Sequence, residues 1–160
     1  MSGSPAAVLI AELARRGLTV AVAESLTGGL LVGELISVPG ASTVVRGGVV
    51  AYATDLKAAL LGVDAGLLAT SGPIHPEVAR QMAAGVRERL GASIGIATTG
   101  VAGPDPQDGH APGEVWLGFA VGDDVRAVGL ALGGDRAAVR RDTVAEAVAG
   151  IRAMLAELPE

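Results

Sequence analysis

The chain has 160 residues, of which 50% are hydrophobic and 18% are charged, and its formal net charge at pH 7 is −5. This length and apolar content predict a single folded domain over residues 1–160 and exclude a disordered chain. The acidic balance, with one tryptophan, one tyrosine and one phenylalanine, argues against nucleic-acid binding, and the lack of cysteine excludes disulfides and thiolate metal sites.

The N-terminal segment Ser4–Arg16 is predicted to form an amphipathic helix, with Pro5 at its first position and Gly17 at its end. Glu12 interrupts its apolar stretch and no basic segment precedes it, which argues against a signal peptide. No stretch approaches the about 18 uninterrupted apolar residues that a membrane span needs. We therefore expect a soluble, cytoplasmic protein that does not contact membranes.

Strands and helices alternate along the rest of the chain. Leu18–Ala23 is typical of a buried strand, Gly28–Ser37 of a helix, and Thr43–Thr54 of a strand pair or a bulged strand. There follow a short helix capped by Asp55, a helix over residues 75–91, a strand at Ala92–Gly100, a loop at Gly100–Gly113, a hairpin around Gly122 and a helix at Asp135–Leu155. This order predicts a three-layer α/β/α sandwich on a mixed, mostly parallel sheet that includes one antiparallel hairpin.

Ligands of open α/β sheets bind beyond the carboxyl ends of the strands. Four segments are expected there: Glu24–Gly29, Ala51–Lys57, Thr98–Gly103 and the start of the last helix. The two glycine-rich turns lack the patterns of a P-loop and of a dinucleotide fingerprint. Each is either a plain turn that needs small residues or a source of backbone N–H groups for an anion.

The stretch "ESLTGG" allows two interpretations. Ser25 or Thr27 could cap the helix that follows, because both residue types are favoured N-caps. Alternatively, Ser25 is a nucleophile whose oxyanion faces the N–H groups of residues 27–29. The second interpretation needs a base, and His75, before a proline, and His110, in a polar loop, are poor candidates for a Ser-His-Asp triad.

Lys57 is the only lysine among twelve basic residues, and it lies in the apolar segment "DLKAALLG". A lysine in an apolar setting can be neutral near pH 7 and act as a base, which arginine cannot do. An ordinary surface lysine is the alternative. Tyr52, the only tyrosine, could share a proton with Lys57 or Ser25, or could be a buried structural residue.

The segment "GGDRAAVRR" places Asp135 at a helix N-cap, with Arg136 and Arg140 one turn apart. Two guanidinium groups near free N–H groups suit a phosphate, and a solvated arginine face is the alternative. Which of Arg136, Arg140 and Arg141 would contact a phosphate is left open. No cluster of Asp, Glu and His has metal-ligand spacing, so no metal site is predicted.

Four stretches in this order, "VAVAESLTGG", "RGGVVAYATDLKAALLGV", "TTGVAGPD…PGEVWLGFA" and "GGDRAAVR", make the chain resemble the C-terminal domain of the competence/damage-inducible protein CinA. The resemblance covers about residues 5–155 and is closest to the single-domain form of the family, whose members are nicotinamide-nucleotide amidases. It places the family's serine, tyrosine and lysine on Ser25, Tyr52 and Lys57. The family's threonine falls on Thr99 and its arginine on Arg140. The chain departs from the family pattern at Glu114 and Leu132, which bears on the details of the pocket.

The resemblance implies hydrolysis of the carboxamide of nicotinamide mononucleotide, in pyridine-nucleotide salvage, with no cofactor and with a homo-oligomeric assembly. Lys57, assisted by Tyr52, would activate Ser25, and N–H groups around Thr27, Gly28 and Gly29 would stabilise the oxyanion. The remaining expected contacts are to nicotinamide and ribose from Thr99, Gly100 and Gly103, and to the 5′-phosphate from Arg140 and Arg136. Alternatives are a nucleotide-binding module without activity, a domain without a small-molecule site, and an amidase of the unphosphorylated riboside.

Overall fold

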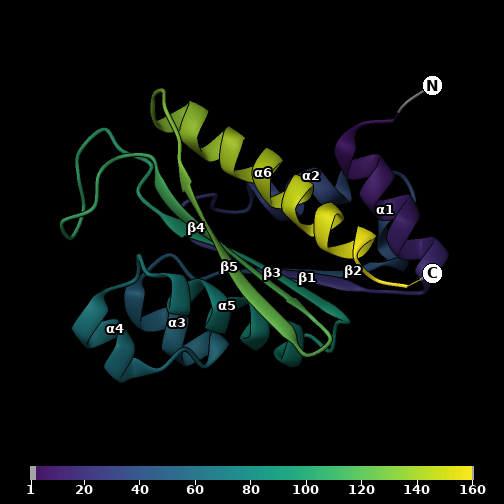
Figure 1. The fold of residues 1–160 in the computed structure, drawn as a ribbon, viewed down its shortest axis with the longest axis horizontal. Coiled ribbons are helices and arrows are strands. Elements are labelled where there is room, and N and C mark those ends of the chain that lie inside the picture. The colour runs from purple at the N-terminus through teal and green to yellow at the C-terminus, as the bar shows by residue number, and fades with distance from the viewer. Residues whose placement is uncertain (1–2, 160) are drawn as a thin grey trace.

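A five-stranded mixed sheet forms the centre of the computed structural model, which describes residues 3–159 (Figure 1). The strand order is β2-β1-β3-β4-β5. β1 is parallel to β2 and β3, whereas β4 is antiparallel to β3 and to β5. The bounds are Val20–Glu24 for β1, Val45–Val50 for β2, Ile94–Gly100 for β3, Glu114–Val121 for β4 and Asp124–Ala131 for β5.

Helices cover both faces of the sheet, which confirms the three-layer α/β/α architecture (Figure 1). One layer contains α1 (Pro5–Arg16), α2 (Leu30–Ile36) and the long α6 (Arg136–Ala156). The other contains α3 (Thr54–Leu61), α4 (Ala65–Ser71) and α5 (Pro76–Arg89). Within residues 3–159, no helix combines the length and the apolar character needed to cross a membrane.

Three predicted helix ends are confirmed: both ends of α1 and the start of α6. Ser4 caps α1 by accepting a hydrogen bond from the Ala7 N–H, and Gly17 ends this helix in the left-handed conformation. Asp135 caps α6, because its side chain accepts a hydrogen bond from the Ala138 N–H.

Several boundaries differ from the sequence prediction. Asp55 does not cap the short helix α3, because it lies in the first turn of that helix, after the N-cap position Ala53. The second helix begins at Leu30 and not at Gly28, because Gly28 and Gly29 have φ values of 53° and 102°, which are not helical. The segment predicted as a strand pair or bulged strand is the single strand β2, with a short 3₁₀ helix at Ala41–Thr43 before it. Its register against β1 shifts between Val45 and Gly47, so that the bulge falls at Arg46.

The two faces of the sheet carry side chains of different size. In β1, Val20 and Val22 face the layer of α1, α2 and α6, whereas Ala21 and Ala23 face α5. The α5 face is completed by glycines that let the helix backbone approach closely. A Cβ atom at Gly95 would lie 2.0 Å from the Ala83 carbonyl oxygen, and one at Gly118 would lie 2.0 Å from that of Ala79. The spacing of α5 from the sheet therefore depends on residues without a side chain.

We predict that Gly118→Ala lowers the free energy of unfolding by at least about 2 kcal/mol, because α5 must move away from β4 to make room for the methyl group. Gly33→Ala is the control, since a Cβ at this helical position meets no atom within 4 Å. That variant is expected to gain about 0.5–1 kcal/mol. Urea unfolding measures both, and equal stability of Gly118→Ala and wild type would contradict the close packing.

Candidate active site

A cavity of about 280 Å³ lies where β1, β2 and β3 end. The predicted convergence of four segments is observed here, because all four contribute to the lining. The lining residues are Ser25, Leu26, Tyr52, Thr54, Lys57, Pro73, Ile74, Thr99, Gly100, Ala102, Gln107 and Arg136.

Ser25 and Lys57 are in direct contact in this cavity. Lys57 Nζ lies 3.1 Å from Ser25 Oγ, 2.7 Å from the Ala51 carbonyl oxygen and 3.5 Å from the Tyr52 carbonyl oxygen. The lysine is 1% exposed and the serine is 8% exposed. Ser25 directly follows β1, the two carbonyl groups follow β2, and Lys57 lies in the first turns of α3. The single lysine of the chain is thus a buried partner of the candidate nucleophile.

Burial lowers the pKa of Lys57 from 10.5 to about 8, because the apolar surroundings disfavour the ammonium form. Its three oxygen partners suit both protonation states. The ammonium form donates three hydrogen bonds, whereas the neutral amine donates two to the carbonyl groups and offers its lone pair to the Ser25 hydroxyl. A proton can therefore pass from Ser25 to Lys57 without leaving a buried polar group unpaired.

Ser25 does not cap α2, so the first interpretation of its local role is wrong. The N-cap position is Gly29, and it makes no side-chain capping bond. The cap comes from Glu24, whose fully buried carboxylate accepts hydrogen bonds from the Leu31 N–H (2.8 Å) and the Val32 N–H (3.1 Å). Sequence reasoning missed Glu24, although an acidic residue at the end of an apolar strand was a usable signal.

The turn that connects Ser25 to α2 is held by several hydrogen bonds. The Ser25 N–H donates to the Thr98 carbonyl (3.1 Å), and the Gly28 N–H donates to the Ser25 carbonyl (3.1 Å). The Thr27 hydroxyl lies 2.8 Å from the Thr98 hydroxyl. Thr27, which is fully buried, therefore ties the turn to β3 through its side chain.

Three backbone N–H groups of this turn, those of Leu26, Thr27 and Gly29, have no hydrogen-bond acceptor within the described residues. Gly29 is half-buried, whereas Leu26 and Thr27 are buried. Leu26 is 4% exposed and Thr27 is 0% exposed, so these donors are shielded from bulk water as well. Buried N–H groups without a partner are rare. Thr27 and Gly29 belong to the predicted set of residues 27–29, whereas the Gly28 N–H closes the turn and is not available. The Leu26 N–H was not in that set. The buried pair, Leu26 and Thr27, directly follows Ser25 in the chain.

Thr99, Gly100 and Tyr52, three further predicted site residues, line different parts of the cavity. Thr99 is buried and its hydroxyl donates to the Pro73 carbonyl at 2.7 Å, while Gly100 lines the wall beside it. Tyr52 is 63% exposed, so it is not a buried structural residue. Its hydroxyl lies 3.3 Å from Arg136 Nη2, and its main-chain carbonyl, not its hydroxyl, faces Lys57.

The arginines at the start of α6 contact different parts of the structure. Arg136 lines the cavity and donates to the Gly103 carbonyl at 2.8 Å. Arg140 is not part of the lining, because its guanidinium group donates to the carbonyl oxygens of Leu26 (2.8 Å) and Thr27 (3.3 Å). Gly28 lies beside it, since a Cβ there would be 3.4 Å from Arg140 Nη2.

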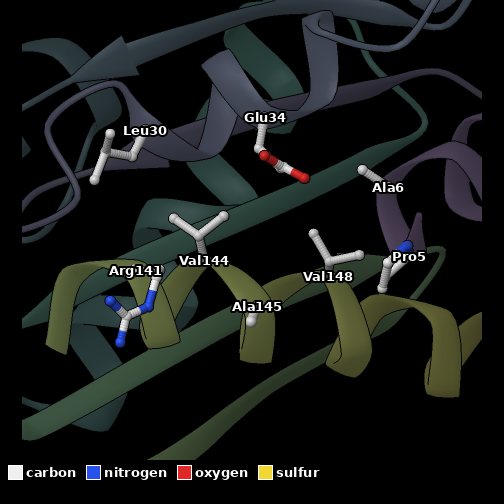
Figure 2. Close-up of a pocket in the computed structure, with 8 residues that line it drawn as sticks. All are labelled: Pro5, Ala6, Leu30, Glu34, Arg141, Val144, Ala145 and Val148. Atoms are coloured by element: carbon white, nitrogen blue, oxygen red, sulfur yellow. The ribbon is translucent and has the colours of Figure 1, made fainter. Parts of the chain in front are cut away.

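Arg141 faces a different cavity, of about 320 Å³, between α1, α2 and α6 (Figure 2). Figure 2 shows its guanidinium group at one side of a mainly apolar lining, with the Glu34 carboxylate on the α2 side. This placement removes Arg141 from the candidates for contact with a ligand near Ser25.

The histidines also lie outside the Ser25 cavity. His75 caps α5 through Nδ1, and His110 pairs with Glu114 in the loop before β4. Across residues 3–159, no group of three or more His, Cys, Asp or Glu side chains is placed to hold a metal ion.

A family model described as the CinA C-terminal domain matches residues 3–155. A CinA-like protein of Frankia casuarinae is 51% identical over 152 residues, which are 95% of this chain and 35% of the relative. A putative competence-damage inducible protein of Geobacillus kaustophilus is 49% identical over 130 residues, which are 81% of this chain and 31% of the relative. The chain thus spans about a third of the length of these curated relatives.

Solved structures show the same fold. A CinA superfamily protein of Klebsiella pneumoniae superposes with a TM-score of 0.93 at 29% identity, covering 96% of this chain and 97% of the other. A competence/damage-inducible protein of Agrobacterium tumefaciens gives a TM-score of 0.90 at 34% identity, covering 96% and 98%.

We predict that Lys57 makes the stability of the protein depend on pH. Below about pH 8 the lysine is protonated in the folded and the unfolded chain, and the folded state bears the full desolvation penalty. Between about pH 8 and 10.5 the folded protein releases the proton while the unfolded chain keeps it, so stability rises with pH. From about pH 7.5 to 9.5 the free energy of unfolding should rise by about 2 kcal/mol from this group.

Urea unfolding of wild type and Lys57→Met at these two pH values isolates the contribution, because other titrating groups are common to both. As the pH increases, the free energy of unfolding of wild type is expected to rise relative to that of Lys57→Met. A difference that does not change with pH would mean that Lys57 keeps an ordinary pKa.

Proposed function

This chain belongs to the CinA C-terminal domain family, and on that premise we propose that it hydrolyses nicotinamide mononucleotide to nicotinate mononucleotide and ammonia. The observation that carries the proposal is the buried contact of 3.1 Å between Lys57 Nζ and Ser25 Oγ. A serine hydroxyl becomes an effective nucleophile when a base within hydrogen-bonding distance accepts its proton. The reaction would place the chain in pyridine-nucleotide salvage.

The proposed reaction proceeds through an acyl-enzyme. Neutral Lys57 accepts the Ser25 proton as the serine oxygen attacks the amide carbonyl carbon. The free N–H groups of Leu26 and Thr27 stabilise the negative charge that develops on the carbonyl oxygen. The carbon–nitrogen bond then breaks, and ammonia leaves with the proton from Lys57. A water molecule, deprotonated by Lys57, attacks the ester and releases the carboxylic acid and Ser25.

The remaining residues of the cavity are proposed to position the substrate. Thr99 and Gly100 form the wall beside the reacting group, and the Gly103 carbonyl fixes Arg136. Tyr52 assists through its main-chain carbonyl, which receives a hydrogen bond from Lys57, and through its hydroxyl next to Arg136.

The charge of the cavity favours an anionic substrate. Its lining contains Lys57 and Arg136, and none of the described residues that line it carries a carboxylate. Arg136 uses only part of its five donors on Gly103 and Tyr52, so further N–H groups are available to a phosphate. We therefore assign the 5′-phosphate of the mononucleotide to Arg136.

Ammonia release from nicotinamide mononucleotide tests the proposed reaction. Ser25→Ala and Lys57→Met are each expected to lower kcat/KM by about 1000-fold or more, because the nucleophile or its base is lost. Ser42→Ala, an exposed serine outside the cavity, is the matched control and should retain wild-type activity. The wild-type kcat/KM should rise with pH to a plateau with a midpoint near the Lys57 pKa of about 8.

Equal activity of all four proteins would exclude the Ser25–Lys57 mechanism. Tight binding of the mononucleotide without turnover by wild type would instead identify a nucleotide-binding module.

Arg136→Gln tests the phosphate assignment. This variant should lower kcat/KM for the mononucleotide by about 10- to 100-fold, the value of a charge-assisted hydrogen bond. The unphosphorylated riboside should be affected far less. Arg141→Gln, on the same helix but facing the other cavity, should leave the preference for the phosphorylated substrate intact. A riboside that wild type hydrolyses as fast as the mononucleotide would contradict the phosphate assignment.

A further inference from the structure

Arg140 is aimed at the main chain of the turn after Ser25, and not into the cavity. Its Nε donates to the Leu26 carbonyl at 2.8 Å and its Nη2 to the Thr27 carbonyl at 3.3 Å. These contacts join residues 113 and 114 positions apart in the sequence. A guanidinium group can bond two successive carbonyl groups because its N–H donors have a fixed, planar arrangement.

The two buried, unpaired N–H groups of this turn, those of Leu26 and Thr27, each belong to a peptide unit whose carbonyl group is anchored. The Leu26 N–H shares its peptide unit with the Ser25 carbonyl, which accepts the Gly28 N–H. The Thr27 N–H shares its unit with the Leu26 carbonyl, which accepts from Arg140. In a planar trans peptide, C=O and N–H point in opposite directions, so an anchored carbonyl fixes the direction of the N–H.

The second peptide unit depends on Arg140. The Ser25–Leu26 unit is held by the turn itself, but the Leu26 carbonyl receives no hydrogen bond from any other described residue. Without Arg140 this peptide unit is free to rotate, and the Thr27 N–H loses its direction. The positive charge at the carbonyl end also polarises the peptide unit, which makes its N–H a stronger donor.

We infer that Arg140 is a positioning residue that orients the Thr27 N–H as an oxyanion donor, and that it is not a ligand of the substrate phosphate. The inference rests on the proposed Ser25 acyl transfer and reassigns the arginine that the sequence resemblance placed at the phosphate. It divides the arginines of α6 by role: Arg136 contacts the substrate, and Arg140 acts through the backbone next to Ser25.

Pyridine-3-boronic acid separates the two roles because it carries the pyridine ring but neither ribose nor phosphate. The Ser25 oxygen forms a bond to boron, its proton passes to neutral Lys57, and the boron becomes tetrahedral and negatively charged. One boron hydroxyl then occupies the position of the oxyanion. Adduct formation is followed by ¹¹B NMR, with Ser25→Ala as the negative control.

Arg140→Gln and Arg140→Lys should each weaken the adduct by about tenfold or more, because one oriented oxyanion donor is lost. Lysine keeps the charge but cannot bond both carbonyl groups with fixed geometry. Arg141→Gln, the neighbour that faces the other cavity, should bind the boronate as wild type does. With the mononucleotide, both Arg140 variants should lower kcat by about 10- to 100-fold and leave KM within about twofold.

If the Arg140 variants bind the boronate as wild type does but have a raised KM for the mononucleotide, the inference is overturned and Arg140 is a ligand of the phosphate. Lower thermal stability with unchanged boronate affinity would overturn it too, since a structural role alone would then suffice. If wild type forms no adduct, the oxyanion site itself is wrong. If the adduct forms and depends on Arg140 but no ammonia is released from the mononucleotide, the proposed substrate fails while the role of Arg140 stands.

Discussion

The buried amine of Lys57 is the interaction on which the rest of the site depends. Its Nζ contacts three oxygen atoms, one hydroxyl and two main-chain carbonyl groups, and no carboxylate shares its pocket. A carboxylate there would favour the ammonium form and raise the pKa, whereas neutral oxygen partners let burial lower it to about 8. Burial of the Lys57 ammonium group therefore destabilises the fold at neutral pH, and the same burial makes the amine able to accept a proton near pH 8.

That destabilisation requires a scaffold rigid enough to hold α3 against the end of β2. Gly95 and Gly118 let α5 pack directly on β3 and β4, and α3 in turn packs against α5. Buried Glu24 holds the start of α2 against the end of β1, because its carboxylate accepts hydrogen bonds from two N–H groups of that helix. Ser25 therefore has no capping role.

The sequence was enough to predict the layers of the fold, because strands and helices alternate along the chain. A single lysine in an apolar segment left open whether Lys57 is a base or an ordinary surface lysine, and the pairing of Ser25 with Lys57 was implied by the family resemblance. The roles of Glu24, Tyr52 and Arg140 were not predictable in the same way. The roles of Glu24 and Arg140 depend on the left-handed conformations of Gly28 and Gly29, which delay the start of α2 and turn the Leu26 and Thr27 carbonyl groups toward α6. A pattern of residue types does not encode which of two nearby arginines those carbonyl groups meet.

Helical geometry explains how three arginines on one helix reach three places. Arg136 and Arg140 are four residues apart, so they differ by about 40° around α6 and by about 6 Å along it. That offset is enough for Arg136 to reach the cavity rim at Gly103 while Arg140 reaches the turn behind Ser25. Arg141 is rotated by about a further 100°, which directs it to the cavity between α1 and α2. The start of α6 therefore contacts both the rim of the cavity and the turn after Ser25, and under the proposed function a shift of this helix would alter substrate binding and the backbone geometry next to Ser25 together.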